Sequence, residues 1–120
     1  MKNTTQLDWK QGALAEGLAC YRSREFFLAH EHWEDVWLRA AEPEKTFLQA
    51  LIHIAAAFHH LGRKNAIGAE RQLQRALRKL EPYPDPFGGV AVELVRQSVR
   101  AWLRVLEEGS AEEMAFPPIG

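Results

Sequence analysis

The sequence predicts an all-α protein: a single-domain bundle of about five helices packed around a central apolar helix. Apolar residues recur every three to four positions in five separate stretches, and no stretch shows the period of two that is typical of strands. The 120 residues correspond to about one domain. Hydrophobic residues make up 47% of the chain and charged residues 26%, which provides both a packed core and a solvated surface.

The first two predicted helices lie before residue 41. The first runs from Leu7 to about Arg22, and Gly12 and Gly17 weaken it. The second follows an N-cap at Ser23 and extends to about Ala40. One face of this second helix carries large apolar residues and one histidine, namely Phe26, His30, Trp33 and Trp37.

The third predicted helix begins at Pro43, whose missing N–H suits a first helical turn, and it ends at Gly62. It is apolar nearly all round, which is typical of a central helix. A fourth helix, capped by Asn65, extends through Leu80, and a fifth covers Val90 to Leu106. Because the connections are short, we expect sequential helices to be mostly antiparallel.

We expect one helical domain over residues 1–120, with its core at about residues 7–108 and a tail at 109–120 that is flexible unless Phe116 and Ile119 dock. The single cysteine excludes an intrachain disulfide, and the first residues lack the apolar segment of a signal peptide, so we expect a cytoplasmic protein. The longest uncharged run, residues 46–62, contains glutamine and histidines, which indicates a buried helix rather than a membrane span.

The charge pattern argues against nucleic-acid binding. The 15 basic and 16 acidic residues give a net charge of −1, so the chain lacks the broad positive field that such binding needs. Residues 63–79 do carry six basic residues and one acidic residue. A phosphate-bearing partner is one interpretation of this stretch, but we expect the basic side chains to form a solvated helix face.

The polar residues of the apolar third helix are the most informative ones. Gln49, His53 and His60 share one stripe of that helix. On the second helix, His30 lies within the aromatic stripe, and Glu34 lies one turn later. Because buried polar groups need hydrogen-bond partners, we infer that the second and third helices meet across these residues.

This arrangement suggests a metal site. His30 and Glu34, at i and i+4, could chelate one divalent ion, with Glu31 about 100° around the helix as the general base for a bound water. The third ligand would be His60 or His53 but not both, because they lie about 10 Å apart along the helix axis. We choose His60, which lies near the helix end, where a site could open to solvent. Zinc, iron, nickel and manganese all suit such a mixed ligand set. Alternatively, the same residues form a buried hydrogen-bond network that orients the bundle without any ligand.

Several spaced motifs resemble domain-of-unknown-function family 309 over roughly residues 10–108. They are Phe26-Phe27-Leu28-Ala29-His30-Glu31-His32-Trp33-Glu34 with Trp37, Phe47-Leu48-Gln49-Ala50-Leu51-Ile52, His60, and Gly62-x-x-Asn65-x-x-Gly68-Ala69. The resemblance implies a small helical bundle of a kind sometimes labelled a predicted metal-dependent hydrolase. The residues that match the family's polar motif are His30, Glu31, Glu34, Gln49 and His60. His53 stands where glutamine is expected, which argues against His53 as an essential ligand.

Two functional hypotheses result. The first is a metal-dependent hydrolase of an unidentified small-molecule substrate, in which His30, Glu34 and His60 hold the ion and Glu31 activates water. The second is a non-enzymatic helical module that binds a protein partner or self-associates. The substrate, the metal and the oligomeric state are left open by the sequence, whereas nucleic acid and membrane are not expected as partners.

Overall fold

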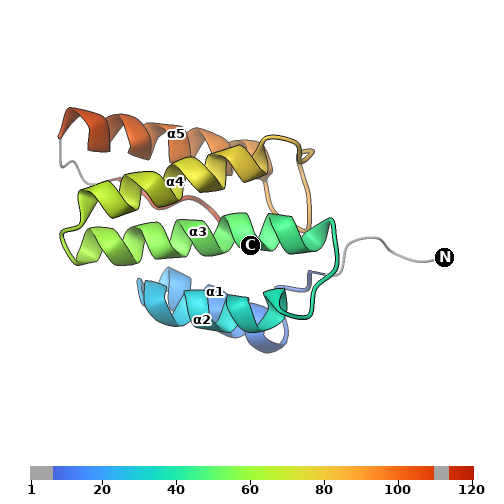
Figure 1. The fold of residues 1–120 in the computed structure, drawn as a ribbon. Helices are drawn as coiled ribbons and strands as arrows, with labels where there is room; N and C mark the ends of the chain where they lie inside the picture. The colour runs from blue at the N-terminus through green and yellow to red at the C-terminus, as the bar shows by residue number, and fades with distance from the viewer. Residues whose placement is uncertain (1–6, 110–113) are drawn as a thin grey trace.

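The computed structural model describes residues 7–109 and 114–120, and it confirms the all-α class. Its helices are α1 (Gly12–Arg22), α2 (Phe26–Trp37), α3 (Glu44–Gly62), α4 (Ala66–Leu80) and α5 (Val92–Glu108). Figure 1 shows α3 between the α1/α2 pair and the α4/α5 pair. In these residues, strand-like pairing is limited to one isolated bridge between Phe87 and Val90. None of the helices described combines the length and apolar character needed to cross a bilayer.

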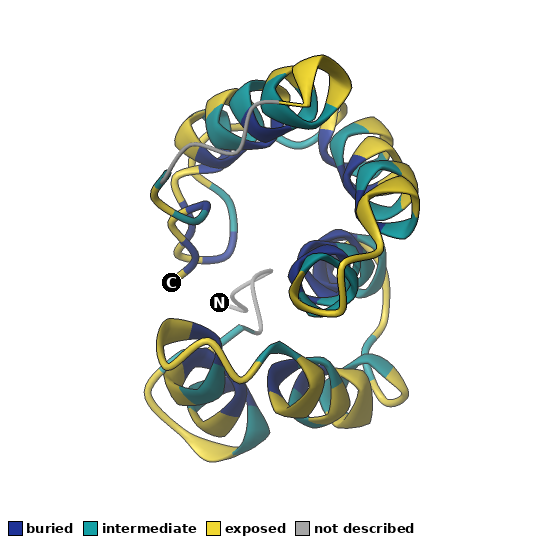
Figure 2. Cartoon of the chain, turned by 90° about the vertical axis from the view of Figure 1, so that its left-hand side faces the viewer, coloured by how far each residue is buried: buried dark blue, intermediate teal, exposed yellow. Residues whose placement is uncertain are grey.

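The central position predicted for the third helix is confirmed. Several side chains of α3 are fully buried, among them Phe47, Leu48, Leu51 and Ile54, and α3 contacts both α2 and α4. Figure 2 shows the helices arranged in an arc, with α3 as its most buried member. The helix with the least polar surface therefore has helices packed on both sides, as the hydrophobic effect requires.

Helix boundaries near the N-terminus differ from those predicted. α1 begins at Gly12 rather than Leu7, because the Asp8 carboxylate accepts a hydrogen bond from the Lys10 N–H (3.0 Å) and holds a turn there. Ser23 ends α1 instead of capping α2. The chain reverses at Arg24, whose φ of 63° is left-handed, and α2 then starts directly after Glu25.

The third and fourth helices lie close to their predicted positions. Pro43 precedes the first residue of α3, and Gly62 is its last residue. The Asn65 cap is confirmed, since its side-chain oxygen accepts a hydrogen bond from the Gly68 N–H (3.0 Å). The fifth helix begins at Val92 rather than at Val90, which takes part in the isolated bridge.

The predicted flexible tail is packed over residues 114–120. Pro117 and Ile119 are buried, and the Tyr21 hydroxyl donates a hydrogen bond to the Pro117 carbonyl (2.8 Å). The remaining residues of that prediction after Gly109, 110–113, lie outside the described residues. Apolar side chains therefore hold this segment against the bundle in spite of its prolines.

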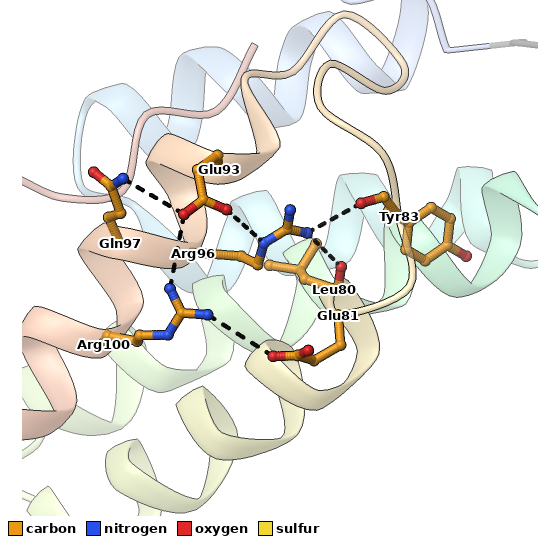
Figure 3. A network of polar contacts seen from close by, with 7 residues as sticks. All are labelled: Leu80, Glu81, Tyr83, Glu93, Arg96, Gln97 and Arg100. Atoms are coloured by element: carbon orange, nitrogen blue, oxygen red, sulfur yellow. Dashed lines mark hydrogen bonds and ion pairs between the residues drawn. The ribbon is translucent and has the colours of Figure 1, made fainter.

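A polar network joins the end of α4 to α5 (Figure 3). The Arg96 guanidinium donates hydrogen bonds to the carbonyls of Leu80 (2.8 Å) and Tyr83 (3.1 Å), and it pairs with Glu93 (3.0 Å). Arg100 forms longer ion pairs, with Glu81 (3.8 Å) and Glu93 (3.9 Å). Arg96 thus satisfies carbonyls at a helix end that lack helical partners.

Replacing Arg96 with alanine should lower the free energy of unfolding by about 1–3 kcal/mol, because the Tyr83 carbonyl loses its side-chain donor and the Leu80 carbonyl keeps only the Tyr83 N–H. The Arg96 side chain is 13% exposed, so water replaces the lost donor poorly. The matched control is Arg100→Ala, whose exposed, longer ion pairs should contribute less than about 1 kcal/mol. Chemical denaturation of both variants measures the difference. Equal losses would contradict the role given to Arg96.

Candidate functional site

The polar stripe of α3 meets α4. His53 Nδ1 donates to the Gln72 side-chain oxygen across the α3–α4 contact (2.7 Å). His60 Nδ1 accepts a hydrogen bond from the Asn65 side-chain N–H (3.1 Å). The partners that the sequence analysis sought on α2 are therefore supplied by α4 and its cap. Helical periodicity places both histidines on one face but does not determine which neighbouring helix covers that face.

His60 helps to tie the start of α4 to the end of α3. The Asn65 side chain accepts from the Gly68 N–H, and this fixes its amide so that the N–H points at His60 Nδ1. A neutral imidazole that accepts at Nδ1 carries its proton on Nε2, so this arrangement leaves neither nitrogen a free lone pair for a metal. Ligation by His60 would require this hydrogen bond to break.

On α2, the three predicted site residues have different surroundings. The His30 ring stacks on Phe27 (centroids 6.2 Å apart, interplanar angle 12°), and its Nδ1 is buried without a hydrogen-bond partner. Glu31 and Glu34 are both exposed. Among the residues that the structure describes, no three His, Cys, Asp or Glu side chains form a group that could hold a metal ion. The metal ligands and the role of Glu31 stay predictions.

A shallow basic pocket lies beside His53. Its volume is about 440 Å³, and its lining residues are Gln49, His53, Arg75, Arg78 and Lys79. We call this set the basic pocket. Gln49 and His53 come from α3, whereas the three cations come from α4. Because α4 runs alongside α3, residues about one turn apart on each helix line the same hollow.

The charge of the basic pocket is largely uncompensated. Within residues 7–109 and 114–120, no ion pair involves Arg75, Arg78 or Lys79. Lys79 does act on one acidic group, Glu42, whose pKa is lowered mainly by hydrogen bonds from Thr46 and more weakly by Lys45 and Lys79. The pocket is therefore a region of positive potential on a chain whose net charge is −1.

His53 responds to these charges. Its pKa is lowered, first by burial and then by the nearby charges of Lys79, Arg75 and His30, while the hydrogen bond to Gln72 partly opposes the shift. His53 is therefore neutral at pH 7. When it takes up a proton in more acidic solution, the basic pocket gains one positive charge beside Arg75 and Lys79.

From the sequence, the basic residues of α4 are expected to form a solvated helix face. Their signal was present as the local excess of positive charge in residues 63–79. Gln72, Arg75 and Lys79 also share one stripe of α4, at i, i+3 and i+7. The sequence pattern does not show which helix lies beside this stripe. Only the α3–α4 contact places it beside Gln49 and His53.

Comparison with known proteins supports the family resemblance and adds no activity. The family model described as "Domain of unknown function (DUF309)" matches residues 14–72, which confirms the resemblance to this family over a shorter range than predicted. The chain is also 28% identical over 104 residues to a protein of Aquifex aeolicus (strain VF5) described as "Uncharacterized protein". This match covers 86% of the chain and 31% of that relative.

Proposed function

We propose that this protein is a helical binding module whose basic pocket takes up a small molecule bearing a phosphate or similar dianionic group. The observation that carries the proposal is the gathering of Arg75, Arg78 and Lys79 around one hollow, with Gln49 and His53 beside them. Arginine matches the geometry of a phosphate through paired N–H donors, and lysine adds a point charge. Such a ligand would supply the negative charge that the described residues do not.

The expected affinity is modest because the pocket is open. Charge-assisted hydrogen bonds contribute about 1.5 kcal/mol each at the lower end of their range, so three contacts support a dissociation constant of about 1 mM. Titration of the full chain with inorganic phosphate at constant ionic strength, followed by NMR of its backbone amides, tests this. Saturable shifts centred on α3 and α4 support the proposal. A response no different from that to chloride would refute it.

Binding of sulfate, which stays dianionic between pH 5 and 8, should strengthen as the pH falls below about 6.5, the ordinary histidine pKa. The lowered pKa of His53 means that the added charge appears only in the lower part of this interval. His53→Gln keeps a polar side chain that cannot titrate, and it should flatten the dependence. An unchanged pH profile in this variant would assign the effect to groups other than His53.

Metal-dependent hydrolysis is the second proposal, and it is favoured by one observation: the buried Nδ1 of His30 has no partner. Glu34, one turn later on α2, could complete a pair of ligands. Elemental analysis of protein purified without chelator should then find metal that is lost in both His30→Ala and Glu34→Ala. His32→Ala is the matched control, since His32 instead pairs with Glu16 of α1 (3.5 Å). Protein that stays metal-free after incubation with zinc, iron, nickel or manganese would contradict this proposal.

A further inference from the structure

Residues 114–120 form an extended segment that joins α1 to α5. Figure 2 shows the chain end in the opening of the helical arc, between its first and last helices. Tyr21 of α1 donates its hydroxyl hydrogen to the Pro117 carbonyl (2.8 Å), and Trp102 of α5 donates its indole N–H to the Ala115 carbonyl (3.0 Å). Two rigid aromatic side chains therefore hold two carbonyls of one short stretch of backbone.

Phe116 is the apolar anchor of this segment. Its ring stacks on Trp102 with the planes 5° apart and packs against Phe58 (4.8 Å between centroids) and Phe26 (5.2 Å). The Arg24 guanidinium lies 5.0 Å from the centre of the same ring. Pro117 and Ile119 are buried beyond it. We call the surface formed by Tyr21, Phe26, Phe58 and Trp102 the segment slot.

The segment slot has the chemistry of a peptide-binding groove. Grooves that bind proline-containing segments combine aromatic walls with side-chain donors to the ligand's carbonyls, and the restricted backbone of proline lowers the entropy lost on binding. The slot shows both features, and its occupant has the sequence Met-Ala-Phe-Pro-Pro-Ile-Gly. The segment thus lies in the bundle as a ligand lies in a binding site, although it is part of the same chain.

We propose that the segment slot also accepts residues 114–120 of a second copy of this chain, so that two molecules can exchange these segments. The fit of this occupant is given by the contacts above, and a second copy carries the same segment and the same slot. Within one molecule the tether gives the segment a high effective concentration, which favours the closed monomer in dilute solution. Exchange therefore requires a high protein concentration.

The first test uses the full chain with Phe116→Ala, which weakens its own segment, and a synthetic peptide of residues 114–120. The Trp102 indole N–H resonance reports occupancy, because this group donates to the Ala115 carbonyl. The variant should bind the peptide saturably, the unaltered chain should bind it at least tenfold more weakly, and a peptide with the same alanine should not bind. A folded variant that does not bind the peptide would overturn the proposal. If Phe116→Ala does not fold, Ile119→Ala, which shortens another buried side chain of the segment itself, replaces it.

The second test identifies the occupant. Light scattering of the unaltered chain at increasing concentration should show a dimer that excess peptide dissociates and that Phe116→Ala prevents. A chain that binds the peptide but stays monomeric at every concentration would overturn exchange between copies and would point to a partner protein carrying such a segment. A dimer that is insensitive to the peptide would also overturn it. Neither result bears on anion binding, because the basic pocket shares no residue with the slot.

Discussion

Reversing the charges of Arg75 and Lys79 together, to glutamate, should abolish binding of sulfate and phosphate by the basic pocket. Each substitution removes an attractive contact and introduces a repulsive one beside the site. Exposed charge pairs contribute up to about 1 kcal/mol each, so two reversals shift the binding free energy by about 2–4 kcal/mol, or about 30- to 1000-fold. The double reversal would raise the dissociation constant from about 1 mM to a value too high to measure. NMR titration at constant ionic strength measures this loss.

The control must change the net charge equally at another place. Arg71→Glu with Arg104→Glu does so, since both side chains are exposed and neither lines the basic pocket. If binding depended only on the overall field of the protein, the two double variants would weaken it alike. We expect the control to retain most of its affinity, and a matching loss in both would exclude a defined anion site. Circular dichroism verifies that both variants keep their helices.

Replacing Gly17 with alanine should destabilise the protein by about 1–3 kcal/mol, although alanine is the better helix former. A Cβ at this position would lie 2.5 Å from Trp33 Cδ1. Trp33 cannot move away easily, because it is fully buried and donates a hydrogen bond to the Leu14 carbonyl (3.3 Å). The steric cost therefore outweighs the gain of about 1 kcal/mol in helix propensity. Urea denaturation measures the net change.

Gly62→Ala is the matched control for this prediction. Gly62 is also a helix residue, but a Cβ there would meet no atom within 4 Å. Its replacement should be neutral or stabilise the protein by up to about 1 kcal/mol, because alanine lowers the entropy of the unfolded chain. If the two alanine variants changed stability in the same direction and by the same amount, the contact between Gly17 and Trp33 would not explain the result.

Features that depend on residues close together in the chain could be predicted from the sequence alone. Apolar spacing fixed the number of helices, the buried face of α2 at Trp33, and the central role of α3, because helical periodicity and burial act on neighbouring residues. The Asn65 cap was predictable for the same reason, since it acts within one turn. The role of Gly17 could not be predicted in this way. The sequence indicates only a residue that weakens the helix, whereas in the structure its missing side chain makes room for Trp33.

The tertiary structure determines which helix faces pack against one another. The sequence showed that His53 and His60 need polar partners, but α3 has neighbours on both sides, and it is α4 and its cap that provide Gln72 and Asn65. The same contact places the cations of α4 beside His53 and forms the basic pocket. Periodicity determines the direction of a side chain relative to its own helix, whereas its partners depend on how whole helices pack, which is a property of the complete core.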